Sequence, residues 1–161
     1  MGSRSRFVTF STLLAAALAL VASGCGGGAT GGRLSKKQYE AKLRTVGTQV
    51  STDLGSLGVV IQNPTVAQLN RTQTGLNQAA RQLDTAKPPK DAAADNQKLA
   101  ASIHFLAASL DQLKKPPQKK SAATLQAFAQ SVAGSSQIQQ GRAATADLRS
   151  KGYNVGPTLG G

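Results

Sequence analysis

The sequence predicts an all-α protein, an antiparallel up-down four-helix bundle, with a three-helix bundle as the alternative. Apolar residues recur every three or four positions through most of residues 34–152, the spacing of one helical face. No stretch alternates apolar and polar residues, and no β-branched cluster lies between hairpin turns. The 161 residues fit one domain, since domains span roughly 100 to 200 residues. Because only 4% of residues are aromatic, we expect a core of Leu, Val, Ile and Ala.

The first 24 residues have the pattern of a signal peptide. Arg4 and Arg6 give a positively charged start with no acidic residue. The strongly apolar part of the following stretch, residues 13–22, is shorter than the about 20 residues that a membrane-spanning helix needs. We therefore expect residues 1–24 to direct export and to be cleaved off.

The segment Ala22-Ser23-Gly24-Cys25 ends this apolar stretch and contains the only cysteine of the chain. It resembles the lipobox of bacterial lipoproteins, in which small residues precede one cysteine. The resemblance covers residues 1–25. It implies cleavage between Gly24 and Cys25, and attachment of diacylglycerol and fatty acyl groups such as palmitate to the Cys25 sulfur. Two acyl chains hold a protein stably on a membrane.

The lipobox resemblance divides the chain into a signal peptide and a mature part. Residues 25–33 form the lipidated cysteine and a glycine-rich tether, residues 34–152 the helical bundle and residues 153–161 an irregular tail. The seven residues after Cys25 reach at most about 25 Å when extended. The domain is therefore expected at the extracytoplasmic face of a membrane; whether that is a plasma or an outer membrane stays open.

The first predicted helix spans residues 34–61. Ser35 and Gln38 form a capping box at its start, where Leu34 is placed to pack on Tyr39. Three glycines weaken its second half by about 1 kcal/mol each, so we expect it to fray or end near Gly55. Its inward positions are Tyr39, Leu43, Val46, Val50, Leu54, Leu57 and Ile61.

The second predicted helix opens at Asn63-Pro64, with the asparagine as N-cap and the proline as first helical residue, and it stops before Pro88. The third begins within residues 89–91. Asp91 and Asp95 lie near its positive end, where acidic side chains are favourable. The inward positions of these two helices are Val66, Leu69, Leu76, Ala80, Leu83, Leu99, Ile103, Leu106, Leu110 and Leu113.

The fourth predicted helix begins after Ser121 and has Gly152 as its C-cap. Its pattern becomes vague through residues 134–136 and at Gly141. The side chains expected to be buried are Leu125, Phe128 and Val132.

Basic residues outnumber acidic ones by 19 to 7, and cleavage of residues 1–24 leaves a side-chain charge of +10. In an up-down bundle, the start of the first helix, the second connection and the end of the last helix share the pole beside the tether. That pole then gathers Arg33, Lys36, Lys37, Lys87, Lys90, Arg149 and Lys151. Basic groups near an anionic leaflet contribute about 1 kcal/mol each, so we expect this pole to lie against phospholipid headgroups.

The opposite pole carries the loop KKPPQKK. Its lysines are the candidate interaction site, although Lys-rich loops commonly just stay solvated. The expected partners are membrane lipid through Cys25 and, for the basic surfaces, anionic envelope polymer, phospholipid or another exported protein. Nucleic acid is not expected, because export removes the chain from it and no aromatic platform accompanies the charge. The candidate residues are Lys114, Lys115, Lys119 and Lys120.

No catalytic or metal-binding pattern is found in the sequence. His104 is the only histidine, and Asp111 lies about 10 Å further along the same predicted helix, too far to share a metal or a proton with it. We expect His104 to be a half-buried helix residue. The motifs of nucleotide-binding loops and serine hydrolases are absent, and the acidic residues are scattered.

These observations favour a non-catalytic, membrane-anchored binding module of the cell envelope, with no cofactor besides the covalent lipid on Cys25. The alternative is a small carrier whose bundle opens to hold an apolar ligand or lipid, and an enzyme is the weakest reading. The mature region is similar in composition to small Ala- and Gln-rich helical lipoproteins, and this likeness indicates no site residue.

Overall fold

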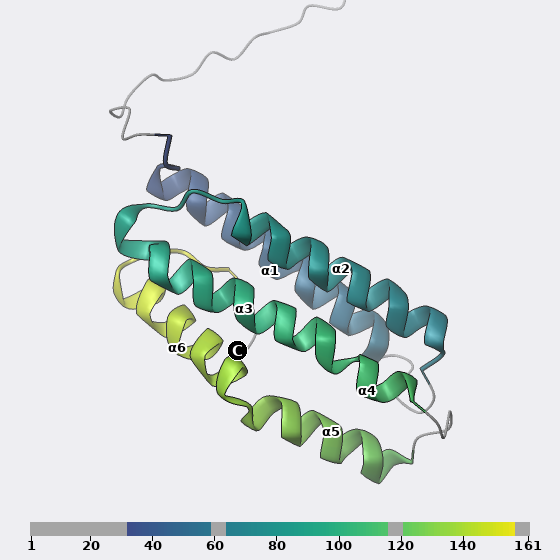
Figure 1. Cartoon of the computed structure of the whole chain (residues 1–161). Coiled ribbons are helices and arrows are strands. Elements are labelled where there is room, and N and C mark those ends of the chain that lie inside the picture. The colour runs from purple at the N-terminus through teal and green to yellow at the C-terminus, as the bar shows by residue number, and fades with distance from the viewer. Residues whose placement is uncertain (1–31, 59–63, 116–120, 157–161) are drawn as a thin grey trace, which may run out of the picture.

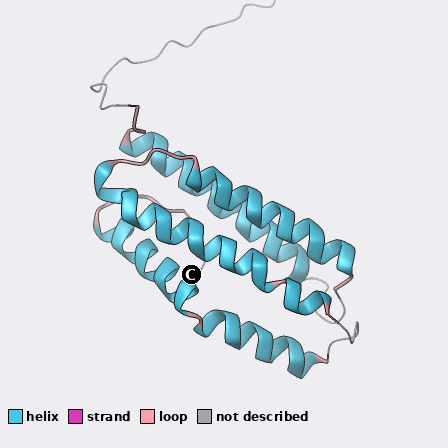
Figure 2. Ribbon diagram, in the orientation of Figure 1, coloured by secondary structure: helices cyan, strands magenta, loops and turns pink. Residues whose placement is uncertain are grey.

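The computed structural model describes residues 32–58, 64–115 and 121–156, which are helical apart from short connections and contain no strand (Figures 1 and 2). The all-α prediction is confirmed for these residues. The elements are α1 Lys36–Gly58, α2 Val66–Asp84, the 3-10 turn η1 Lys90–Ala92, α3 Ala93–Ser109, α4 Asp111–Lys114, α5 Ala122–Gly134 and α6 Ser136–Ser150.

Four of the helices carry most of the packing. α1 packs on α2, α2 on α3, and α3 on α6. Consecutive members of this series run in opposite directions, so the start of α1, the end of α2, the start of α3 and the end of α6 lie at one end of the molecule (Figure 1). α5 packs mainly on its neighbour α6 and extends to the opposite end.

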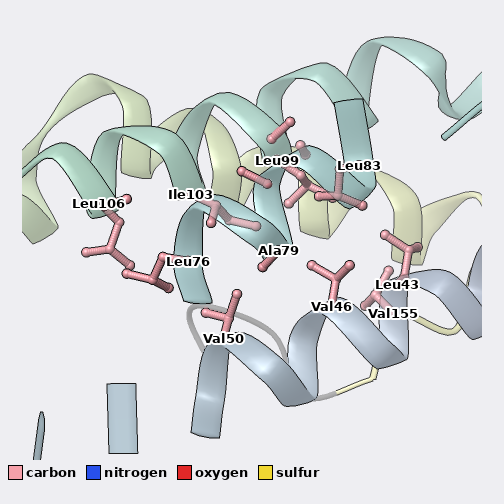
Figure 3. Packing of buried hydrophobic residues seen from close by; sticks show 14 of the residues in the cluster. Leu43, Val46, Val50, Leu76, Ala79, Leu83, Leu99, Ile103, Leu106 and Val155 are labelled. Atoms are coloured by element: carbon pink, nitrogen blue, oxygen red, sulfur yellow. The ribbon is translucent and has the colours of Figure 1, made fainter. Parts of the chain in front are cut away.

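Aliphatic side chains fill the space between these helices, as Figure 3 shows for α1, α2 and α3. Leu76 and Leu83 of α2 are at most 1% exposed, and Ile103 of α3 is 3% exposed. Complete burial of such a side chain stabilises a fold by about 1.5 to 3 kcal/mol. Val155, beyond the last helix, lies beside Leu43 in the same cluster.

The helix starts follow the capping rules, with one wrong prediction. Ser35 and Gln38 form the predicted reciprocal bonds, at 2.9 and 3.3 Å. α2 begins at Val66 rather than at Asn63-Pro64, because the Thr65 hydroxyl accepts from the Gln68 amide and the Gln68 side chain accepts from the Thr65 amide. Val66, predicted to face inward, is consequently 40% exposed at the helix start.

Two further helix boundaries differ from the prediction. α1 continues through Gly55, whose added Cβ would meet nothing within 4 Å, and ends at Gly58. The third predicted helix starts as the turn η1, and α3 ends at Ser109 before the short α4. Gly55 therefore does not end α1, and no glycine or proline marks the break between α3 and α4 at Leu110.

The fourth predicted helix is two helices. Ser135 has an extended backbone, with ψ at 147°, and its hydroxyl accepts from the Ile138 amide, so it ends α5 and caps α6. α5 contains no buried residue. Leu125, Phe128 and Val132, predicted to be buried, are only partly so.

Gly152 ends α6 as predicted and turns the chain back onto the core. Its φ of +75° lies in the left-handed region, which glycine adopts without strain. The Tyr153 amide donates to the Leu148 carbonyl and the Gly152 amide to the Arg149 carbonyl, the two bonds of a Schellman motif. Residues 153–156 are not helical, yet Tyr153 and Val155 are at most 5% exposed, so this segment is part of the core.

Candidate functional site

The start of α1, the connection between α2 and η1, and the end of α6 meet at one end of the molecule, here called the tether pole: residues 32–40, 84–95 and 147–156 (Figure 1). The Leu34 amide donates to the Lys87 carbonyl at 2.7 Å, and the Arg33 guanidinium donates to the Pro88 carbonyl at 2.9 Å. The Lys36 ammonium donates to the Lys151 carbonyl at 3.3 Å. The predicted convergence of these three segments is confirmed.

The charge of the tether pole differs from the prediction. All seven predicted basic residues lie within its ranges, but five of the seven acidic residues of the chain do as well, which leaves a net charge of only +2. Of the charge of +10 expected for residues 25–161, most therefore comes from residues outside the tether pole. The acidic residues of the tether pole are Glu40, Asp84, Asp91, Asp95 and Asp147.

Lys151 is at the centre of an ion-pair cluster rather than on a presented surface. Its ammonium lies 2.7 Å from the Asp95 carboxylate and 2.8 Å from the Asp147 carboxylate, and it donates to the Asp91 carbonyl at 2.7 Å. The hydrogen bonds to Asp147 and Asp95 raise the pKa of Lys151, and the bond from Lys151 lowers the pKa of Asp147. Asp95, expected only near a helix start, is 2% exposed and depends on this partner.

Two tyrosines connect the segment after α6 to α1 and η1. The rings of Tyr39 and Tyr153 meet edge to face, with centroids 5.8 Å apart. The Tyr153 hydroxyl donates to both Asp91 carboxylate oxygens at 2.9 and 3.0 Å, and the Tyr39 hydroxyl donates to Asn96 at 3.1 Å. Burial and, after it, the hydrogen bond to Asp91 raise the pKa of Tyr153 to about 12; burial also raises the pKa of Tyr39.

A hollow of about 570 Å³ opens at the tether pole, beside the α2–η1 connection and the first turn of α3. Its wall combines two cations, one carboxylate and two amides over small apolar residues. The lining residues are Arg33, Asp84, Ala86, Lys87, Pro88, Ala93, Asn96 and Gln97.

His104 contacts one of these lining residues. Its Nε2 lies 2.8 Å from the Asp84 carboxylate, and both side chains are nearly half exposed. The expectation of a half-buried helix residue is confirmed, but sequence analysis considered only Asp111 as its neighbour. Asp84, on α2, was missed because only the packing of α2 on α3 brings it next to His104.

The candidate loop at the opposite pole is described only at its start. Lys119 and Lys120 lie outside the described residues. The Lys114 ammonium pairs with Asp111 at 2.8 Å and also bonds to Gln73, and its side chain is 20% exposed. Lys114 therefore joins α4 to α2, while Lys115 is exposed, and the role of the loop as an interaction site stays a prediction.

One half-buried carboxylate, with one inaccessible oxygen, lies apart from both poles. Asp53 Oδ2 has no hydrogen-bond partner among the described residues, and the carboxylate lies against the backbone of Gly75, where a Cβ would not fit. Burial raises the pKa of Asp53. This side chain is a second polar feature that no sequence pattern indicated.

The described residues contain neither a group of metal-ligating side chains nor a helix suited to crossing a bilayer. Within the described ranges, no three His, Cys, Asp or Glu side chains are grouped so that they could hold a metal ion. None of the helices in these ranges is both long and apolar enough to cross a bilayer. Gly24 and Cys25, the predicted cleavage and lipidation residues, lie outside the described part of the chain.

Comparison of the chain with protein-family models, with curated proteins and with solved structures finds no match.

Proposed function

We propose that the chain is the precursor of a membrane-anchored extracytoplasmic lipoprotein whose helical domain is a non-catalytic binding module of the cell envelope. The observation that carries the proposal is the position of the only cysteine. Cys25 directly follows Ala22-Ser23-Gly24 at the end of an apolar stretch that is too short to span a membrane. Cleavage before Cys25 and attachment of diacylglycerol to its sulfur would give the mature protein two acyl chains, enough for stable anchoring.

The geometry of the tether pole supports operation close to the membrane. Residues 26–32 span at most about 25 Å. Directly after them, Arg33 and Leu34 bond to the carbonyls of Pro88 and Lys87, so the described part of the chain begins at the tether pole. This end of the domain is therefore the one that the lipid anchor keeps near the headgroups.

We also interpret α1, α2, α3 and α6 as an up-down four-helix bundle, with α5 as an arm at its edge. The pairwise packing of these helices in chain order and their alternating directions support this reading. A binding role is supported by the polar hollow of the tether pole, whose wall includes Arg33, Lys87 and Asp84. The candidate partners are phospholipid, anionic envelope polymer and another exported protein.

The position of α5 favours one alternative, a carrier for an apolar ligand or lipid. α5 has no charged residue, buries no side chain and packs mainly on α6. Its partly buried Phe128 and Val132 lie against the core cluster. Movement of α5 away from α6 would expose these apolar residues to a ligand.

Metabolic labelling of the producing cells with a palmitate analogue tests the anchor. We expect the label on the wild-type chain and in the membrane fraction, and none on Cys25→Ser. Retention of label by Cys25→Ser would refute the proposal, as would a wild-type chain that stays in the cytoplasm with residues 1–24 attached. Native mass spectrometry of the mature chain then separates the two functions, because a bound apolar molecule released on denaturation indicates the carrier.

A further inference from the structure

The hollow at the tether pole has the volume of a small-molecule site and the chemistry of a polar one. Its volume of about 570 Å³ lies within the range of roughly 300 to 1,000 Å³ typical of ligand pockets. Only small residues, Ala86, Pro88 and Ala93, contribute apolar surface, while five of its eight lining residues are polar or charged. A hollow of this composition suits a headgroup rather than an acyl chain.

Two cations lie on one side of this hollow. One Nη of Arg33 donates to the Pro88 carbonyl, which fixes the guanidinium against the connection, and its other N–H groups make no further hydrogen bond within the described residues and can serve a ligand. The Lys87 ammonium lies beside Gly32, since a Cβ on Gly32 would be 3.8 Å from the lysine nitrogen. A guanidinium and an ammonium on neighbouring segments are the groups that bind phosphate oxygens in proteins.

The hollow also contains the carboxylate of Asp84, whose negative charge would weaken the binding of a simple anion. Asp84 Oδ2 lies 2.8 Å from His104 Nε2, on the adjacent helix, and Asp84 forms part of the wall. The Asn96 amide does not compete for a ligand, because it bonds to Leu83 and Tyr39. Cations and a carboxylate in one hollow fit a ligand that carries both a phosphate and an ammonium group.

We propose that this hollow binds the phosphoethanolamine headgroup of a membrane phospholipid, with Arg33 and Lys87 on the phosphate and Asp84 on the ammonium group. The inference of a membrane source rests on the proposed lipid anchor, because the residues between Cys25 and Arg33 keep the hollow within about 25 Å of the anchoring lipid. A tether also supplies an effective ligand concentration in the millimolar range, so an open and weak site is sufficient.

Binding of two matched soluble probes tests the headgroup chemistry. The mature chain, purified in a neutral detergent, is titrated with O-phosphoethanolamine and with ethyl phosphate, and amide chemical shifts are followed by NMR. We expect chemical-shift changes at the amides of residues 33, 84, 87 and 97, and about threefold tighter binding of O-phosphoethanolamine than of ethyl phosphate. A surface that only attracts anions gives the opposite preference, because ethyl phosphate carries the larger negative charge.

Single substitutions test which side chains of the hollow bind the phosphate and which binds the ammonium group. Arg33→Gln and Lys87→Gln are expected to weaken both probes about threefold to tenfold. Asp84→Asn should remove the preference for O-phosphoethanolamine, whereas His104→Gln, which breaks the ion pair but keeps the carboxylate, should retain it. Lys90→Gln is the matched control, an exposed cation at the same pole outside the hollow, and should change either affinity less than twofold. Equal weakening by Lys90→Gln, or an unchanged preference in Asp84→Asn, overturns the proposal.

A lipid titration separates the membrane source from soluble phosphate compounds. The lipidated chain is placed in nanodiscs of phosphatidylcholine, with and without phosphatidylethanolamine. The trimethylammonium group of phosphatidylcholine cannot donate a hydrogen bond to Asp84, so we expect shifts at the hollow only with the second lipid. If the chain carries the palmitate label but shows no such shifts, headgroup binding is refuted and the anchor is not. If an unlabelled chain binds O-phosphoethanolamine, the anchor is refuted and headgroup recognition is not.

Discussion

Substitution of Gly141 by alanine perturbs a close contact between α6 and α3. A Cβ on Gly141 would lie 2.5 Å from Ser102 Oγ and 2.7 Å from Ser102 Cβ. Rotation of the serine side chain would relieve the first contact but not the second, because the position of Cβ is set by the backbone of α3. Since carbon atoms pack best at about 3.5 to 4.0 Å, the two helices would have to separate by about 1 Å.

The change in the free energy of unfolding has two opposing contributions. Overpacking a well-packed core costs about 1 to 3 kcal/mol. Replacement of a mid-helix glycine by alanine contributes about 1 kcal/mol in the stabilising direction. We therefore expect Gly141→Ala to lower the free energy of unfolding by up to about 2 kcal/mol, which corresponds to a fall in Tm of up to about 8 °C. Urea and thermal unfolding of the mature chain, followed by circular dichroism, measure both quantities.

Gly55→Ala is the matched control for this change. A Cβ on Gly55, in α1, meets nothing within 4 Å, so the same substitution should stabilise the protein by about 0.5 to 1 kcal/mol. The exchange Ser102→Gly with Gly141→Ala removes the contact and should restore most of the loss. The packing argument is wrong if Gly141→Ala is as stable as Gly55→Ala, or if the exchange is no better than Gly141→Ala alone.

Three further predictions concern the tether pole. Gly152→Ala should cost about 1 to 2 kcal/mol in urea unfolding, because alanine is strained at a φ of +75°; an unchanged midpoint would contradict this. The fold raises the pKa of Tyr153 from about 10 to about 12, so the folded state favours the neutral phenol. The resulting stabilisation should be complete below pH 10 and be lost between about pH 10 and 12. Tyr153→Phe should make this loss of stability with pH shallower, and an identical pH profile in the variant would argue against the prediction. Lys151→Met should lower the urea midpoint more than Lys90→Met, since it leaves the buried Asp95 without its cation, and equal effects would show that the ion-pair cluster contributes little.

Helix ends were predictable where a single local signal is present. Ser35 with Gln38, and Ser121 alone, cap their helices as expected, because a hydroxyl accepts from an amide three residues ahead whatever the rest of the fold does. For α2, the sequence pattern predicted Asn63 as the N-cap, whereas the structure has Thr65 in that position. Only Thr65 has a glutamine at the third following position, and this reciprocal bond decides between them.

The burial of the fourth predicted helix was not predictable from its pattern. Leu125, Phe128 and Val132 are spaced as one helical face requires, but spacing identifies a face and not the element that covers it. The extended backbone of Ser135 separates α5 from α6, and α5 consequently lies at the edge. The segment after α6 is the opposite case, since it is buried although its pattern did not predict burial. Residues 153–156 have no helical periodicity, but the turn at Gly152 holds them against the core.

The charge at the tether pole depends on topology in a way that no local rule conveys. Asp91 and Asp95 were explained as residues at a helix start, and Asp147 as a scattered surface acid, because each is compatible with its own neighbours in the chain. Only the return of α6 to the start of α3 places Lys151 between all three. The same convergence puts a carboxylate next to Arg33 and Lys87 in the hollow, so a pole expected to attract any anion is instead suited to a ligand with charges of both signs.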